Sequence, residues 1–228
     1  MDRKGTIESI FDAPRALIGM LHVGALPGTP RSSQPIEDLI ERVVDEARLY
    51  REAGFHGLLL ENMHDRPYLR GGGGPEIVAA MTVVAHEVRS QVPLPLGVQV
   101  LAAANRQALA VGAAVGAEFI RVEGLVFGHV ADEGWIESDA GELMRYRRNL
   151  GAERIRIFAD VKKKHSSHAV TADLDLGETA LAAQFFLADG VIVTGSATGR
   201  PACPEDVAEV SSKVEVPTLI GSGITAAN

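Results

Sequence analysis

Polar side chains recur in this sequence at the points where short apolar runs end. They are His22, Glu61, Asn62, Gln99, Arg121, Glu123, Asp160, Lys162, Lys164, Thr194 and Ser222. If the runs are parallel strands of one closed sheet, these side chains meet at its carboxyl edge although they are far apart in the chain. Each position alone fits a hydrogen-bonded interior residue or a charge facing solvent. The set as a whole favours a functional site.

Three carboxylates of this set could take part in chemistry directly. Glu61, Glu123 and Asp160 are of the type that ligates Mg²⁺ or acts as general acid and base. No compact ligand motif such as H-E-x-x-H accompanies them, so the sequence leaves open whether a metal is bound. His22 fits a general base or a ligand, and it fits a hydrogen-bonded core histidine almost as well.

A basic cluster, Lys162 to His165, follows Asp160 directly. If the strand continues through this cluster, the alternation of side chains places Lys162 and Lys164 on one face. An amine in that position could neutralise a phosphate or a developing enolate. The alternative is an ordinary solvated loop.

Two loops that contain glycine, 194–199 and 221–223, have the composition of phosphate-binding turns. Glycine lets backbone N–H groups approach an anion closely, and a following helix N-terminus favours negative charge. In eight-stranded barrels the loops after strands seven and eight often bind phosphate. The residues expected to make this contact are Thr194, Gly195, Ser196, Gly221, Ser222 and Gly223. An ordinary Gly/Ser turn is the alternative.

The elements that must position these residues follow from the apolar pattern. Strands are expected at 17–23, 57–60, 96–101, 119–122, 155–161, 190–193 and 217–220. Helices are expected near 7–11 and at 36–53, 75–90, 106–115, 140–150, 175–188 and 204–213. The stretch 124–138 is predicted to be a long loop. Gly71 to Gly74 carry a large ordering entropy, which predicts mobility unless a ligand fixes them.

Strands that alternate with helices predict a parallel α/β sheet, and continuous apolar strands predict that both of its faces are covered. The closed solution at this size is the TIM (β/α)₈ barrel, which typically has about 250 residues. Seven strands in 228 residues predict a single domain, 1–228, that lacks the last helix–strand–helix of such a barrel. The alternative is an open doubly wound sheet, but no G-x-G-x-x-G follows the first strand.

Composition excludes several classes of protein. A net charge of −8 and 5 % aromatic residues argue against a nucleic-acid binder. The single cysteine, Cys203, excludes an internal disulfide and suits a reducing compartment, so a cytoplasmic location is expected. The N-terminus lacks the apolar core of a secretory signal. The sequence also contains no run of about 20 apolar residues, so no membrane span is predicted.

Eight segments of this chain, taken together, resemble the BtpA family. They are IGMLHVGALPGTP (18–30), ENMHDRPY (61–68), GVQVL (97–101), FIRVEG (119–124), DEGWIES (132–138), ADVKKKH (159–165), VIVTGSATGRP (191–201) and GSGITAAN (221–228). The resemblance implies a barrel of the ribulose-phosphate-binding kind. The family takes its name from a role in photosystem I biogenesis in cyanobacteria, and relatives occur in organisms without photosynthesis.

Several candidate residues fall on motif positions of that family. They are His22, Glu61, Asn62, Arg121, Asp160, Lys164, His165, Thr194, Gly195, Gly221 and Ser222. The chain departs from the family pattern at 102–105, where Ala-Ala-Ala-Asn stands in place of an Arg-Asn-Asp group. The family also continues past the GSG loop. Without that last unit, strands one and seven would have unpaired edges, which predicts lower stability and homo-oligomer formation.

The sequence therefore predicts a barrel that binds a small phosphorylated or otherwise anionic metabolite. Glu61, Asp160 and Lys164 would form the acid–base or metal-binding centre, with Mg²⁺ as a candidate ion, and His22 and Asn62 would orient the substrate. The reaction class suggested by fold analogy is that of an isomerase, lyase or aldolase. The alternative is a non-catalytic assembly or stability factor of the kind that the family name suggests.

Overall fold

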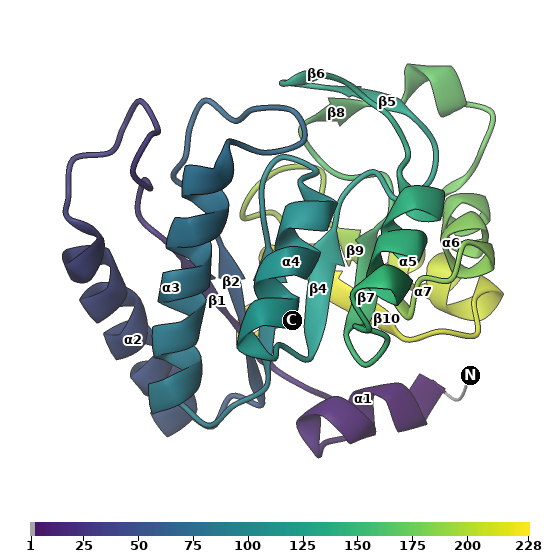
Figure 1. Ribbon diagram of the computed structural model, residues 1–228. Coiled ribbons are helices and arrows are strands. Elements are labelled where there is room, and N and C mark those ends of the chain that lie inside the picture. Colours follow the sequence, from purple (N-terminus) through teal and green to yellow (C-terminus); the bar gives the residue numbers. More distant parts are fainter. Residues whose placement is uncertain (1–2) are drawn as a thin grey trace.

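Seven parallel strands form one curled sheet whose order is β1-β2-β3-β4-β7-β9-β10 in this computed structural model, which describes residues 3–228 (Figure 1). The strands are β1 Ile18–His22, β2 Gly57–Glu61, β3 Leu96–Gln99, β4 Phe119–Val122, β7 Arg156–Asp160, β9 Gly190–Thr194 and β10 Thr218–Gly221. The helices are α1 Arg3–Phe11, α2 Ile36–Glu52, α3 Pro75–Gln91, α4 Asn105–Val115, α5 Ala140–Asn149, α6 Leu176–Phe185 and α7 Pro204–Lys213. Each predicted strand and helix is present, with ends shifted by up to four residues.

Two apolar clusters fill the two faces of the sheet. One lies between the strands and the helices outside them. The other lies inside the curl and contains Phe11, Leu59, Phe119, Phe158 and Ile192. Phe11 comes from α1, which lies across the amino end of the strands (Figure 1), and its ring centroid is 5.6 Å from that of Phe119. The interior is therefore a packed core at the amino end, and polar residues occupy the carboxyl end.

One hydrogen-bonding pattern recurs between neighbouring strands at the amino end of the sheet. The residue just before a strand accepts a hydrogen bond from the first free N–H of the preceding strand. His56 accepts from Leu17 at 3.1 Å, Glu118 from Leu96 at 2.8 Å, and Asp189 from Ile157 at 3.0 Å. Arginines from the helix that precedes the donor strand also donate to the two carboxylates, Arg89 of α3 to Glu118 and Arg147 of α5 to Asp189. These charged residues thus stabilise the sheet at the end opposite the candidate site.

The sheet is curled but not closed within residues 3–228, because β1 pairs with β2 alone and β10 with β9 alone. Tyr50 of α2 covers part of the open β1 edge. Its hydroxyl donates to the Met20 carbonyl at 3.2 Å, and a Cβ on Gly19 would lie 2.6 Å from its ring. A residue larger than glycine at position 19 would therefore displace this tyrosine.

No helix within residues 3–228 is long and apolar enough to cross a membrane.

A second, three-stranded sheet corrects the prediction that 124–138 is a loop. It contains β5 His129–Ala131, β6 Gly134–Ile136 and β8 Ser166–Ser167, in the order β6-β5-β8, and a 3₁₀ turn, η1 Ala169–Thr171, follows. It lies above the carboxyl ends of β4, β7 and β9 (Figure 1). Strands of two or three residues carry too little periodicity to be recognised from sequence.

Candidate functional site

The carboxyl ends of the strands form the region that we call the mouth. It is lined by His22, Glu61, Gln99, Arg121, Asp160, Thr194 and Gly221, each the last residue of its strand except Arg121, which is the last but one. Strand register places His22 opposite Glu61 and Glu61 opposite Gln99. On the far side, Gly221 lies opposite Thr194, and a Cβ on Gly221 would lie 4.0 Å from Nη1 of Arg121. Side chains from distant parts of the sequence therefore meet in one place.

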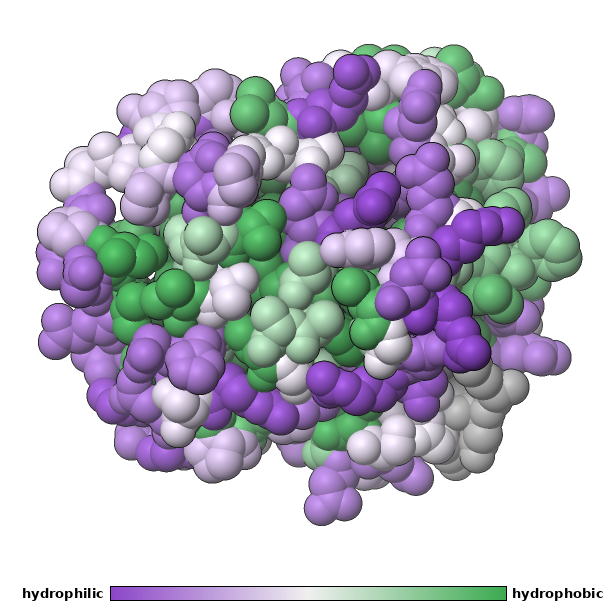
Figure 2. Space-filling model, viewed as in Figure 1, coloured by the Kyte–Doolittle hydropathy of each residue, from purple (hydrophilic) through white to green (hydrophobic). Residues whose placement is uncertain are grey.

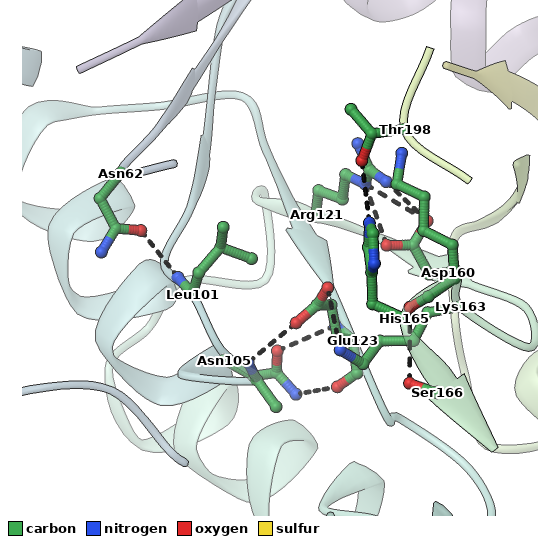
Figure 3. Close-up of polar contacts among 12 residues, drawn as sticks. Asn62, Leu101, Asn105, Arg121, Glu123, Asp160, Lys163, His165, Ser166 and Thr198 are labelled. Atoms are coloured by element: carbon green, nitrogen blue, oxygen red, sulfur yellow. Dashed lines mark hydrogen bonds and ion pairs between the residues drawn. The ribbon is translucent and has the colours of Figure 1, made fainter. Parts of the chain in front are cut away.

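Arg121 and Asp160 form a two-point ion pair across the centre of the mouth (Figure 3). Nε of Arg121 lies 3.0 Å from Oδ2 of Asp160, and Nη2 lies 3.0 Å from Oδ1. Their side chains are 13 % and 1 % exposed. Burial alone would lower the pKa of Arg121, but the charges of Asp160 and Glu61 outweigh it and raise that pKa. The guanidinium is therefore a permanent charge that a ligand anion could approach.

His22 and Glu61 form the second pair, with 3.3 Å between Nε2 and Oε2. The hydrogen bond to Glu61 raises the pKa of His22 against the opposing effect of burial. Burial alone would raise the pKa of Glu61, but the hydrogen bond from His22 and the charge of Arg121 lower it overall. The pair therefore holds a proton on the imidazole in the mildly acidic range, as a general acid requires.

A cavity of about 320 Å³ opens beside His22, on the α2 side of β1. Its polar lining includes Arg42, Asp45, Glu46 and His64. Burial raises the pKa of Glu46 and lowers the pKa of His64. His22 thus lines this cavity and also contacts Glu61 at the mouth.

Asn62 is buried, but its amide is engaged by the protein. Its Oδ1 accepts from the Leu101 N–H at 2.8 Å, and its Nδ2 donates to Asp65 at 2.8 Å. Asp65 in turn accepts from the Leu26 N–H at 2.8 Å. The side chain that the sequence assigned to substrate orientation thus connects the loops after β1, β2 and β3. Its contacts support a positioning role for those loops.

A third ion pair, between Glu123 and Lys163, was not predicted from the sequence. Lys163 Nζ lies 3.6 Å from Oε1 of Glu123, and the lysine is 7 % exposed. Glu123 also accepts from the Ala103 N–H at 3.0 Å, while its backbone exchanges hydrogen bonds with the Asn105 side chain (Figure 3). Burial raises the pKa of Glu123. The 102–105 segment, where the chain departs from the family pattern, thus supports this carboxylate through backbone and amide groups.

The prediction that Lys162 and Lys164 share a strand face is wrong. β7 ends at Asp160, and the backbone turns with a φ of +45° at Lys162. The Lys162 amine donates to the carbonyls of Thr171 and Leu174. Lys164 instead lies within the field of Arg121, Asp160 and Glu61, where burial and then the charge of Arg121 lower its pKa. Only the second of these two lysines contributes to the mouth.

The two expected phosphate loops pack against each other. The hydroxyl of Ser222 accepts from the Gly199 N–H at 3.0 Å, and His165 Nε2 lies 2.9 Å from the Thr198 hydroxyl (Figure 3). A Cβ on Gly195 would lie 2.1 Å from the Arg200 carbonyl, and one on Gly223 would lie 2.4 Å from Pro201 N. The close approach that these glycines permit is therefore to the chain itself.

The four-glycine stretch is likewise held by the chain. The Gly71 N–H donates to the Ala102 carbonyl at 2.9 Å, and the Gly71 carbonyl accepts from Gln107 at 2.7 Å. A Cβ on Gly72 would lie 2.5 Å from that of Ala104. Contacts with 102–107 thus offset part of the ordering entropy that made mobility the prediction.

The mouth contains an unpartnered acceptor but no constellation suited to Mg²⁺. Gln99 is 2 % exposed, and its Oε1 has no hydrogen-bond partner among the described residues, 3–228. Within residues 3–228, no three or more His, Cys, Asp or Glu side chains are grouped so that they could hold a metal ion. The carboxylates of the mouth are each paired with a cationic side chain instead. These donors do not fit a magnesium site.

The BtpA family model matches residues 13–228 of this chain. An uncharacterised protein of Caenorhabditis elegans, named as mitochondrial, is 48 % identical over 234 residues, which cover 100 % of this chain and 84 % of that protein. The photosystem I biogenesis protein BtpA of Synechocystis is 36 % identical over 214 residues, which cover 93 % of this chain and 74 % of that protein.

Solved structures share the fold at low sequence identity. A Burkholderia cenocepacia protein described as a phosphonomutase candidate superimposes with a TM-score of 0.56 at 17 % identity, covering 96 % of this chain and 84 % of that one. Orotidine 5′-monophosphate decarboxylase of Methanocaldococcus jannaschii has a TM-score of 0.50 at 12 % identity, covering 88 % and 82 %. These likenesses confirm the TIM-barrel type of fold, and at such identities they show the fold alone.

Proposed function

This chain belongs to the BtpA family, and from that premise we propose that its mouth binds a small phosphorylated or otherwise anionic metabolite and acts on it as a lyase, isomerase or aldolase. The observation that carries the proposal is the concentration of paired charges at one end of the sheet. Arg121–Asp160, His22–Glu61 and Lys163–Glu123 lie there, and all of these side chains except that of His22, which is 38 % exposed, are largely buried. Ion pairs of this kind add little net stability, because desolvation offsets their attraction.

The balance of charge in the mouth favours an anion. Each of the three carboxylates already has a cationic partner, so the Lys164 amine adds a positive charge without a counter-charge. An anionic group beside Arg121 and Lys164 would supply that counter-charge. The backbone near Gly221 adjoins the Arg121 guanidinium and would complete the contact.

The remaining side chains of the mouth are proposed to contact the rest of the ligand. The imidazolium of His22, held by Glu61, is the proposed general acid, and the free Oε1 of Gln99 is the proposed acceptor for a ligand hydroxyl. The cavity of about 320 Å³ beside His22 is in the range of small-ligand pockets. For N–H groups at 195–196 and 222–223 to reach a phosphate, the Ser222–Gly199 and His165–Thr198 contacts would open.

A thermal-shift screen against inorganic phosphate, sugar phosphates and glycerol 3-phosphate tests this proposal. A ligand at 100 times its dissociation constant stabilises the fold by about 2.7 kcal/mol, a shift that is easily measured. We expect Lys164→Gln to lose the shift and Lys213→Gln to keep it, because Lys213 pairs with Asp175 and Glu209 on α6 and α7. A folded chain that responds to no anion, or an equal shift in both variants, would overturn the proposal.

A non-catalytic assembly role is the second candidate, and two observations favour it. The Synechocystis relative is named for photosystem I biogenesis. In addition, Phe185 and Leu187 at the end of α6 are 80 % and 63 % exposed, and Figure 2 shows apolar surface on that side of the molecule. If the protein is an enzyme, Glu61→Gln should abolish its function in a cell that depends on it. If the protein is an assembly factor, Phe185→Ser should instead impair its function in that cell.

A further inference from the structure

Helix α6 has an apolar outer face as well as an apolar inner face. The inner face buries Ala180 and Ala183, whereas Leu181 and Phe185 on the outer face are 40 % and 80 % exposed. In α2, by contrast, nearly all of the exposed side chains are charged. A helix that is apolar on both sides is typical of one that is covered on both sides. Nothing within residues 3–228 covers the outer face of α6, as the exposure of Phe185 shows.

The apolar surface continues past the carboxyl end of α6. Phe186 and Leu187 follow Phe185 directly and are 46 % and 63 % exposed. The rings of Phe185 and Phe186 meet edge to face, with 5.6 Å between their centroids. Leu181 lies one helical turn before Phe185 on the same face. These four side chains form one contiguous surface, which we call the α6 patch, and Figure 2 shows apolar surface on that side of the molecule. Such patches mark interaction sites, and phenylalanine is enriched in them.

The two ends of the α6 patch carry opposite charges. Glu178, at the amino end of α6, is exposed on the same face of the helix as the patch, and its carboxylate closes the capping box. Beyond the carboxyl end, Arg147 and Arg156 both pair with Asp189, at 2.7 Å and 3.2 Å. Two guanidinium groups share this one buried carboxylate, so an excess positive charge remains two residues past the patch.

We propose that the α6 patch is the interface of a homodimer, in which α6 packs antiparallel against α6 of a second copy around a twofold axis near Ala183. Leu181 and Phe185 are equally far along the helix from Ala183, so Phe185 of each copy meets Leu181 of the other. Phe186 and Leu187 lie at the edges of this contact. A twofold interface of this kind uses the same surface on both chains, and it is the commonest way in which identical chains associate.

The charges at the two ends select the antiparallel arrangement. Glu178 and Ala188 are also equally far from Ala183, so Glu178 of one copy stands level with Ala188 of the other, beside Arg147 and Arg156. Each acidic end therefore meets a basic end, and this happens twice across the axis. A parallel arrangement would bring like charges together at both ends.

The same charges argue against an anionic membrane as the occupant. Juxtamembrane segments that bind anionic lipid carry about 4–8 lysines and arginines, whereas here Asp189 and the exposed Glu178 offset most of the positive charge. The α6 patch also lies near the amino end of β9, at the opposite end of the sheet from the mouth. The homodimer is therefore compatible with either candidate function, and it assigns to a second copy the surface that an assembly role would otherwise use.

Sedimentation velocity of the whole chain, from about 1 to about 100 µM, tests the proposal. We expect a dimer whose dissociation constant rises at least about 100-fold in Phe185→Ser, because the twofold axis removes a central aromatic from both chains. Leu181→Gln should act in the same direction, and circular dichroism shows whether each variant is folded. The control is Leu49→Ser, since Leu49 is 66 % exposed on α2, beside the open edge of β1.

Three results would overturn the proposal. They are a wild type that is monomeric throughout the range, a Phe185→Ser dimer as tight as that of the wild type, and a dimer that only Leu49→Ser dissociates. The last result would place association at the open sheet edge. Dissociation by Phe185→Ser and Leu181→Gln, with no change in Leu49→Ser, would support the α6 interface.

Cross-linking tests the antiparallel geometry. Ala182, half-buried on α6 and next to the proposed axis, is replaced by cysteine in a chain whose exposed Cys203 is replaced by serine. A residue near a twofold axis lies close to its own copy, so a short bis-maleimide should join two Ala182→Cys chains. The control is Ala114→Cys, an exposed position on α4, which should stay uncoupled. Equal coupling of the two variants, or none in Ala182→Cys, would overturn the antiparallel interface.

Discussion

The guanidinium of Arg121 meets the carboxylate of Asp160 through two contacts of 3.0 Å at the centre of the mouth, where the Asp160 side chain is 1 % exposed. β4 carries the arginine and β7 the aspartate, so this pair joins adjacent strands across their carboxyl ends. It fixes one cation in place, while the Lys164 amine has no hydrogen-bond or ion-pair partner among residues 3–228. The arrangement makes the pair both a structural constraint and part of the proposed anion site.

Removing one member of this pair should cost stability, because the other is left as an uncompensated buried charge. Asp160→Asn should lower the free energy of unfolding by about 3–5 kcal/mol, measured by urea titration. Arg121→Met combined with Asp160→Leu should recover most of that loss, since the double variant buries no charge. The double variant should not bind any anion that stabilises the wild type. A double variant as unstable as Asp160→Asn would show that the pair itself is needed for folding.

The His22–Glu61 pair predicts a stability optimum between mildly acidic and neutral pH. The raised pKa of His22 contributes stability below pH 6.5 that is lost as the pH rises through its folded value. The lowered pKa of Glu61 contributes stability above pH 4.5 that is lost as the pH falls through its folded value. Unfolding free energies measured from pH 4 to 8 should therefore vary less in Glu61→Gln than in the wild type. Identical profiles would contradict this coupling.

The parallel barrel could be predicted because its strands are buried on both faces and so appear as continuous apolar runs between helices. The convergence of polar strand ends follows from that topology. The small sheet was missed since its strands are too short for a periodic signal and Val130 pairs with Ser167, far away in sequence. The pair formed by Lys163 and Glu123 was missed for a related reason, because the turn at Lys162 ends the alternation on which the prediction depended.

The types of site residue were easier to predict than their partners. Asn62 stands where the sequence placed it, but its amide is used by Leu101, in the loop after β3, and by Asp65, three residues further along its own loop. The glycines of 195 and 223 were assigned to phosphate on composition, whereas they contact Arg200 and Pro201. The Asn62–Leu101 and Gly223–Pro201 approaches join different strand connections. Such contacts depend on the tertiary fold, and local spacing does not specify them.

Gly97 on β3 should tolerate no side chain. A Cβ there would lie 2.2 Å from the ring of Phe119, which is buried in the interior cluster. Gly97→Ala should therefore destabilise the chain by about 1–3 kcal/mol through overpacking. Phe119→Leu should partly rescue it by making space. Gly141→Ala in α5 is the control, because its Cβ would meet only the flexible end of Arg145, and a change in the unfolding midpoint as large as that of Gly97→Ala would argue against the steric explanation.

His129 should make the chain sensitive to acid through the small sheet above the mouth. It is 4 % exposed, and its Nε2 has no hydrogen-bond partner in the part of the chain that the structure describes. It borders a cavity of about 20 Å³, which is room for one water molecule. Burial, and then the charges of His168 and Lys163, lower the pKa of His129 to about 4. Because the unfolded chain takes up this proton near pH 6.5, stability should fall by on the order of 3 kcal/mol as the pH drops from 6.5 to 4.

His129→Gln keeps a polar side chain but does not titrate, so it should remove this part of the acid sensitivity. At pH 4.5 the backbone amide of Lys163 should exchange its hydrogen faster in the wild type than in the variant. His168 lies 5.2 Å away between ring centroids, and its Nε2 donates to the Lys163 carbonyl. Unfolding curves at pH 7, where His129 is neutral in both states, supply the reference. Equal losses of stability in the wild type and in His129→Gln between pH 6.5 and 4 would place the acid sensitivity elsewhere in the chain.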